Sequence, residues 1–149
     1  MLPPDQLRAL ATAFRDAIER ADRPGLGIRF ESFPTGSCGD ASPLLGRFLK
    51  DHGAGEVTYV LGERGELNRD WTSHAWLRVD GYIVDITADQ FSDMDERVIV
   101  RATSPWHESF EEEDQHEGDY RVYDAATVAK LGRIYAQILE VLDPALRPE

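Results

Sequence analysis

Near its middle the chain carries the stretch Ser73-His74-Ala75-Trp76-Leu77-Arg78-Val79-Asp80-Gly81-Tyr82-Ile83-Val84-Asp85-Ile86-Thr87. Strand-forming residues fill both halves of this stretch, and Asp80-Gly81 separates them. An Asp-Gly pair in this setting is typical of a two-residue β-hairpin turn, because both turn positions require a positive φ. The stretch therefore predicts two antiparallel strands, over residues 73–79 and 82–87.

The predicted turn determines which side chains share a face of the hairpin. With two residues in the turn, Val79 pairs with Tyr82, and each step back along one strand matches a step forward along the other. His74 and Asp85 are then diagonal neighbours on one face, with Cβ atoms about 7 Å apart, so their side chains can hydrogen-bond. A three-residue loop would place them on opposite faces. The hairpin thus predicts a His–Asp pair.

Cys38 is the only cysteine of the chain, and it lies in the stretch Gly36-Ser37-Cys38-Gly39-Asp40. A structural cysteine usually packs among large aliphatic residues, so small and polar neighbours favour a reachable thiol. A nearby imidazole and the N-terminus of a helix can each lower the pKa of a thiol. Cys38, His74 and Asp85 therefore form a candidate set of nucleophile, base and orienting acid.

The start of the helix after the cysteine is ambiguous. Ser42-Pro43 fits an N-cap followed by proline at the first helical position. Alternatively the helix begins at Cys38 with an irregular first turn, and we favour this because it places the thiol at the positive end of the helix. The charge of Asp40 would oppose the thiolate, so we expect its carboxylate to turn inward and accept backbone N–H groups of its own loop.

Hydrophobic periodicity and helix-end signals predict the remaining elements. The expected elements are a helix over residues 4–22, a strand over 27–33, a helix that ends before Gly53, a strand over 57–61, a polar loop through Gly62, Gly65 and Asn68, a strand over 97–102, an acidic loop over 108–119, and a helix over 125–142 with Asp124 as N-cap.

Together these elements predict an α+β fold. Four or five antiparallel strands pack on the helix that follows the cysteine loop, and the N- and C-terminal helices flank them. The 149 residues contain no internal repeat and no linker-like shift in composition, so residues 1–149 predict a single domain.

An acyl-transfer thiol also requires hydrogen-bond donors for the oxyanion that forms during attack. The backbone N–H of Cys38 is the natural first donor. The second donor stays open among the Trp76 indole, the Gln90 amide and a loop N–H from residues 33–37. Ser37, Trp76 and Gln90 are therefore the candidate oxyanion or substrate-binding residues.

The formal net charge of −12 argues against binding to nucleic-acid phosphates or to an anionic membrane. Much of this charge lies in residues 108–119, where a run of like charges favours a solvated loop. The alternative for this segment is a docking surface for a basic protein partner. His107 and His116 lie in or beside the segment and are expected at the surface.

A single cysteine cannot form an internal disulfide, which argues against the disulfide-stapled secreted class. We expect neither a signal peptide nor a membrane span, because charged residues interrupt the apolar runs. A cytoplasmic protein with a reduced thiol is therefore expected. No cofactor or metal is expected, because the chain has no phosphate-binding glycine loop and lacks the paired spacing of common zinc motifs.

Residues 33–91 resemble the transglutaminase-like branch of the papain-like cysteine enzymes, which includes arylamine N-acetyltransferases, some cysteine peptidases and several bacterial deamidases. The pattern of that group is a cysteine at the head of a helix, then a histidine and an aspartate on successive antiparallel strands. The resemblance rests on Cys38, His74-Ala75-Trp76, Asp80-Gly81 and Val84-Asp85-Ile86-Thr87. It implies that Cys38 is the nucleophile, His74 the base and Asp85 the orienting acid.

The expected function is thiol-dependent chemistry on a peptide, amide or thioester substrate, through a covalent acyl-enzyme on Cys38. Hydrolysis by a thiol protease, amidase or deamidase shares this first step with acyl transfer, and the sequence leaves the choice open. The alternative is a non-catalytic binding or scaffold module of the same fold, which would dock a basic partner through residues 108–119.

Overall fold

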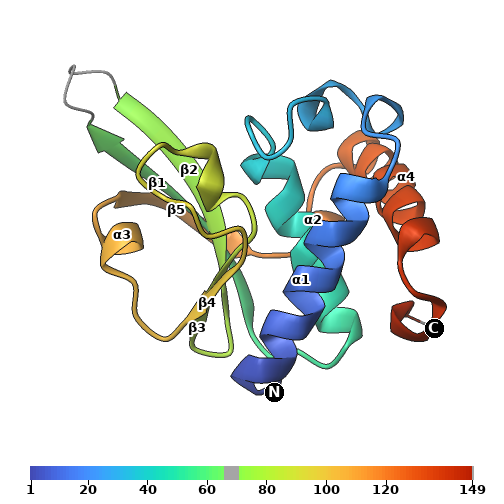
Figure 1. The fold of residues 1–149 in the computed structure, drawn as a ribbon, viewed down its shortest axis with the longest axis horizontal. Helices are drawn as coiled ribbons and strands as arrows, with labels where there is room; N and C mark the ends of the chain where they lie inside the picture. Colours follow the sequence, from blue (N-terminus) through green and yellow to red (C-terminus); the bar gives the residue numbers. More distant parts are fainter. Residues whose placement is uncertain (66–70, 149) are drawn as a thin grey trace.

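The computed structural model describes residues 1–65 and 71–148, and Figure 1 shows its architecture. Within these residues the fold is α+β, with four α-helices and a five-stranded antiparallel sheet. The helices are α1 (Pro4–Arg20), α2 (Cys38–Asp51), α3 (Pro105–Glu108) and α4 (Ala125–Val141). The strands are β1 (Val57–Gly65), β2 (Trp71–Val79), β3 (Tyr82–Asp85), β4 (Ile99–Arg101) and β5 (Glu111–Glu117).

The sheet has the strand order β4-β3-β2-β1-β5, so β2 is its central strand. Val79 pairs with Tyr82 across the turn, which confirms the predicted register of the β2–β3 hairpin. Asp80 and Gly81 have φ values of 50° and 88°, as a two-residue turn of this kind requires. The turn chemistry therefore sets the register on which the His–Asp pair depends.

Apolar side chains cover both faces of the sheet. In Figure 1, α1, α2 and α4 gather on one side of the sheet, and α3 lies on the other side. The larger core joins the three long helices to one face of the sheet, and the Phe14 and Phe48 rings meet in it at 5.0 Å between centroids. The smaller core contains Val60, Trp76, Ile83 and Phe110, with Phe91 and Trp106 packed against it.

The two terminal helices agree with the predictions. The expected inner face of α1 is buried, at Leu7, Leu10, Ala11, Phe14 and Ile18. Helix α4 begins after Asp124, whose carboxylate accepts the Thr127 N–H and so satisfies one of the free donors of the first turn. None of the described helices combines the length and the apolar composition that crossing a bilayer demands.

The strand predicted over residues 27–33 is wrong. These residues form the 3-10 segment η2 (Ile28–Phe30) followed by turns. Phe30 and Phe33 are buried, whereas Ile28 is 81% exposed. The buried positions are three residues apart, which is the repeat of a 3-10 turn and not the alternation of a strand.

Strand β1 is longer than predicted. The polar loop was expected to include Gly62 and Gly65, but both residues pair with β2 in the sheet, and Asn68 lies outside the described residues. A Cβ at Gly62 would lie 2.9 Å from side-chain atoms of both Trp76 and Phe110. This glycine therefore permits close approach of aromatic rings to the strand, rather than starting a loop.

The acidic loop predicted over residues 108–119 is also wrong, because residues 111–117 form strand β5. This strand pairs antiparallel with β1 and lies at one edge of the sheet. Nearly all of its side chains are exposed, so it shows none of the apolar–polar alternation that marks a half-buried strand. Charged side chains on an edge strand also disfavour pairing with other chains.

Candidate active site

Cys38 is the first residue of α2, and Ser37 is the N-cap. The thiol therefore lies at the positive end of the helix, where the helix dipole favours an anion. Pro43 leaves the carbonyl of Gly39 without its intrahelical donor, yet the helix continues to Asp51. As a residue, Cys38 is partly exposed.

His74 on β2 joins the thiol to a carboxylate. Its side chain is 0% exposed, and its Nε2 lies 2.7 Å from Oδ2 of Asp85. This contact confirms the diagonal pair predicted from the hairpin. Because Asp85 occupies Nε2, Nδ1 is the ring nitrogen left for other groups, and Nε2 of Gln90 lies 3.4 Å from it. The Cys38 thiol and the His74 ring are close enough for each to shift the pKa of the other.

Asp85 ends strand β3 and is buried. Its Oδ1 accepts the backbone N–H of Thr87 at 2.9 Å and the Thr87 hydroxyl at 3.4 Å. Its Oδ2 accepts from His74 and, also at 2.7 Å, from Nε2 of His107. A buried carboxylate requires several donors, and this one has four.

His107 was expected at the surface, and this prediction is wrong. The residue lies on α3 and is only 3% exposed. Its Nδ1 lies 2.6 Å from the hydroxyl oxygen of Ser104, the N-cap of α3. The sequence did contain one signal: Ser104 followed by Pro105 fits an N-cap with proline at the first helical position, which would have placed His107 in the first turn.

The charges of these residues stabilise one another. Burial raises the pKa of the Cys38 thiol, but the hydrogen bond and charge of His74 and the backbone N–H of Ala75 lower it below its usual value. Burial lowers the pKa of His74, but the charge and hydrogen bond of Asp85 outweigh burial and raise it to about 9. Despite its burial, Asp85 has a strongly lowered pKa, because His74 and His107 both favour its charged form.

These pKa shifts predict the pH dependence of thiol reactivity. The thiol pKa is lowered and that of His74 is about 9, so a thiolate–imidazolium pair exists from below the ordinary thiol pKa of about 8.5 up to about pH 9. Alkylation of Cys38 by iodoacetamide should therefore reach half of its maximal rate below pH 8.5. A single midpoint at or above pH 8.5 would contradict the ion pair.

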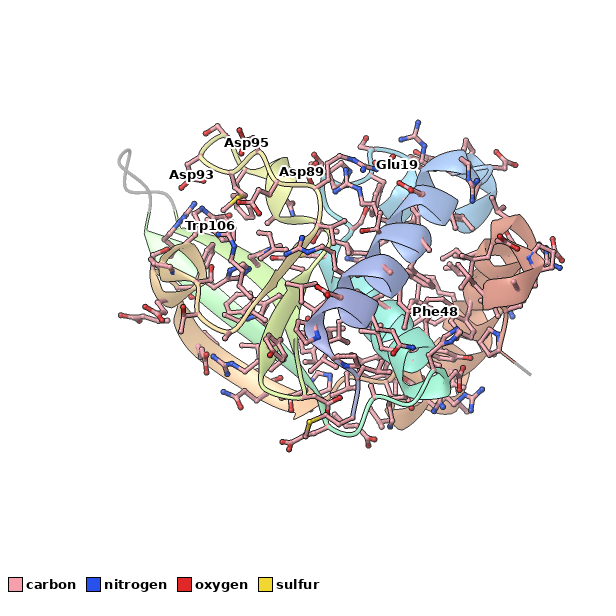
Figure 2. All side chains as sticks on the ribbon, turned by 60° about the horizontal axis from the view of Figure 1, so that its bottom comes forward. Glu19, Phe48, Asp89, Asp93, Asp95 and Trp106 are labelled. Carbon is pink, nitrogen blue, oxygen red and sulfur yellow. The ribbon has the colours of Figure 1, made fainter. Side chains whose placement is uncertain are left out.

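Four aromatic side chains, Trp76, Phe91, Trp106 and Phe110, surround the His74 ring with centroids 5.1–6.0 Å away. We call them the aromatic cluster. Figure 2 shows Trp106 on the side of the molecule that carries α3, near the loop with Asp93, and Phe48 away from it among the helices. The cluster keeps water from the His74–Asp85 contact, which strengthens that contact.

A cavity of about 820 Å³ lies against the outer side of the aromatic cluster. Phe91 and Trp106 line it, together with Arg64 and Asp93, and Cys38 is not among its lining residues. This cavity therefore reaches the rings that enclose His74 rather than the thiol.

The candidate oxyanion donors lie in different environments. The backbone N–H of Cys38 donates to no group in the described part of the chain. The Gln90 amide lies beside the site, because its Nε2 is 3.4 Å from Nδ1 of His74 while its Oε1 accepts the Gly36 N–H. The Ser37 hydroxyl points away and donates to the carbonyl of Arg29 at 2.6 Å.

Trp76 differs from the other candidates. Its ring is part of the aromatic cluster and on the His74 side of the sheet, and its Nε1 is buried without a partner among the residues described. Its role as an oxyanion donor stays a prediction. The Cys38 N–H likewise has no hydrogen-bond partner in the described part of the chain, and the Gln90 amide lies beside His74.

The expectation for Asp40 is wrong. Its Oδ2 is buried and has no hydrogen-bond partner within residues 1–65 and 71–148. Its charge instead acts on two tyrosines: burial and the charge of Asp40 raise the pKa of Tyr123 to about 12, and Asp40 contributes to the raised pKa of Tyr59.

The surface position expected for His116 is also wrong. His116 is half-buried, and its ring stacks on the Tyr59 ring with centroids 4.4 Å apart.

Arg15 of α1 holds the segment that carries Gln90. Its guanidinium is 3% exposed and binds both carboxylate oxygens of Asp89, at 2.6 and 2.9 Å. Asp89 lies in η3 (Ala88–Gln90), so this ion pair fixes the 3-10 turn beside His74. Figure 2 shows Glu19, which also pairs with Arg15, and Asp89 on neighbouring segments.

His74, Asp85 and His107 have donor atoms within 4.8 Å of one another and could by composition hold a divalent metal ion. In the structure both rings direct Nε2 at the same carboxylate oxygen, at hydrogen-bond distance. The three side chains therefore satisfy one another without an ion.

No family model matches this chain, and no curated protein or solved structure gives a significant match to it.

Proposed function

We propose that this protein is a cysteine enzyme of the transglutaminase-like, papain-like type, which acts on an amide or thioester through an acyl-enzyme on Cys38. The observation that supports this most is the buried hydrogen bond between His74 and Asp85, beside a thiol whose pKa His74 lowers. The Cys38 thiol lies at the N-terminus of α2, the His74 imidazole is charged, and the Asp85 carboxylate orients that imidazole. Each of these features favours the thiolate, which is the reactive form of cysteine.

The proposed reaction has two steps. In the first, Sγ of Cys38 attacks the carbonyl carbon, and the C–N bond of the amide or the C–S bond of the thioester breaks. The thiol proton, which His74 holds, passes to the departing amine or thiol. In the second, water or an acceptor amine attacks the acyl-enzyme, His74 takes its proton, and the C–Sγ bond breaks. Water gives hydrolysis, and an amine gives acyl transfer.

The developing negative charge on the carbonyl oxygen needs nearby donors. The unengaged N–H of Cys38 supplies one, reinforced by the dipole of α2. The Gln90 Nε2 supplies the other, since Arg15 holds its segment against the His74 ring. Removal of the Gln90 side-chain amide is therefore expected to lower the acylation rate of Cys38 more than it lowers the affinity for the substrate.

Acylation by p-nitrophenyl acetate tests the proposal. The full-length protein should release a burst of p-nitrophenolate equal to its own concentration and carry an acetyl group on Cys38, detected by mass spectrometry. At pH 7 the rate should exceed that of N-acetylcysteine, because the lowered pKa of Cys38 raises its thiolate fraction above the few per cent of a free thiol. Cys38→Ala is the matched control and should give no burst.

A rate no higher than that of N-acetylcysteine would reject the catalytic proposal. The second candidate, a binding module that docks a basic partner through residues 108–119, would then account better for the structure. The observation that favours it is the exposed acidic strand β5 at an open edge of the sheet. Such binding should weaken at high salt, since exposed charges are screened.

A further inference from the structure

We propose that His107, held by Ser104, is a positioning residue that fixes the Asp85 carboxylate for its action on His74. The inference rests on the proposed function and extends the three-residue site to five residues: Cys38, His74, Asp85, His107 and Ser104. Neither His107 nor Ser104 is close to the triad in sequence, and only the fold brings them to it.

The first support is that two rings share one oxygen. Oδ2 of Asp85 lies 2.7 Å from Nε2 of His74 and 2.7 Å from Nε2 of His107. An oxygen held from two directions cannot rotate toward either ring alone. The position of Asp85 relative to the base is thus determined jointly by β3, which carries Asp85, and α3, which carries His107.

The second support is the hydrogen-bond direction at Ser104. Its hydroxyl oxygen accepts the backbone N–H of His107 at 3.3 Å, so its own hydrogen is available for Nδ1 of the same residue at 2.6 Å. Nε2 then carries the ring hydrogen and donates it to Asp85. Ser104 therefore selects the tautomer of His107 that can hold the carboxylate.

The third support is burial. Ser104, His107 and Asp85 are each at most 3% exposed, and the His107 ring packs against Trp76 and Trp106 at 4.9 Å between centroids. Water cannot replace the donor that His107 supplies. A buried carboxylate that loses a donor is left with an uncompensated desolvation cost, so it will move or recruit another donor.

The charged groups near His107 lie mainly on its outer side. A cavity of about 350 Å³ there is lined by His107 together with Arg78, Glu108 and Glu112, and Arg78 forms an ion pair with Glu112. On the inner side, the ionisable groups facing the ring are Asp85 and, beyond it, His74, with ring centroids 6.4 Å apart. The contact with Asp85 is thus separated from the exposed charges by the ring itself.

Two variants of the full-length protein test the proposal by p-nitrophenyl acetate acylation. His107→Phe keeps an aromatic ring but removes the donor, and should lower the acylation rate about tenfold. His107→Gln can place an amide N–H near the former Nε2, and should recover most of the rate. Ser104→Ala should have an intermediate effect. His52→Phe, at the far end of α2, is the matched control and should retain the wild-type rate.

A spectroscopic measurement separates positioning from a general structural role. In wild-type protein, NMR should show exchange-protected Nε2–H protons for both His74 and His107, because each lies 2.7 Å from the buried Asp85 carboxylate. His107→Phe should remove one signal and shift the His74 signal, although the backbone spectrum stays folded. An unshifted His74 signal with an unchanged acylation rate would overturn the proposal, as would stoichiometric metal that is lost in His107→Phe. Failure of wild-type acylation alone rejects the proposed function but leaves this NMR test intact.

Discussion

His74→Gln is expected to lower the acylation rate of Cys38 by about 10²-fold at neutral pH, because glutamine cannot take up the thiol proton. The loss should be larger at pH 6 than at pH 9, since the thiol of the variant ionises unaided only at alkaline pH. The amide of glutamine can still donate to Asp85, so the buried carboxylate keeps a partner and the fold is retained. The burst of p-nitrophenolate, measured at several pH values, checks this expectation.

The matched control for this variant is His52→Gln, which makes the same chemical change at the other end of α2. His52 caps the helix, and its Nε2 lies 2.8 Å from the carbonyl oxygen of Leu146. Its replacement should leave the acylation rate unchanged. Equal losses in the two variants would show that the His74 effect is only structural. An unchanged acylation rate in His74→Gln would show that His74 does not act as the base.

Gly46→Ala is expected to have the largest effect on stability, a loss of about 3 kcal/mol in the free energy of unfolding. Gly46 lies in α2, and a Cβ there would lie 1.8 Å from the carbonyl oxygen of Gly118 and 3.2 Å from Cγ1 of Val57. The first neighbour is backbone, and a hydrogen bond from the Gly118 N–H to the Val57 carbonyl holds it in place. It therefore cannot yield as a flexible side chain would.

Gly132→Ala in α4 provides the matched control. The nearest atoms to its Cβ, on the Tyr120 ring, lie at 3.8 Å, which is ordinary contact. Alanine in a helix is favoured over glycine by about 0.5–1 kcal/mol, so this variant should be slightly more stable than wild type. Urea unfolding of both variants measures the difference, and a Gly46→Ala midpoint equal to that of wild type would mean that α2 does not pack as closely as described.

The predicted parts of the site share a physical origin in local chain geometry. Asp80-Gly81 requires a two-residue turn, the turn fixes the β2–β3 register, and the register places His74 and Asp85 side by side. The position of Cys38 at the start of α2 likewise follows from residues within a few positions of it. Both inferences depend only on the backbone dihedral preferences of nearby residues and on the alternation of side chains along a strand.

The wrong predictions concern residues whose environment comes from distant segments. His107 is buried because α3 folds back over Asp85, twenty-two positions earlier in the chain. Strand β5 exists because its backbone pairs with β1, and its exposed acidic side chains give no sign of that pairing. The Asp40 carboxylate accepts no hydrogen bond from the described part of its loop, and its charge acts on Tyr59 and Tyr123, which come from distant segments.

Local sequence patterns were thus enough for the hairpin, the three long helices and the pairing of an imidazole with a carboxylate, because short-range sterics and turn chemistry control these features. Long-range contacts alone give the carboxylate its second imidazole, tie the segment of Gln90 to Arg15 and make the acidic segment an edge strand of the sheet. Contacts of this kind join elements far apart in the chain. They depend on which surfaces pack against one another in the folded protein, and local sequence patterns do not predict that packing.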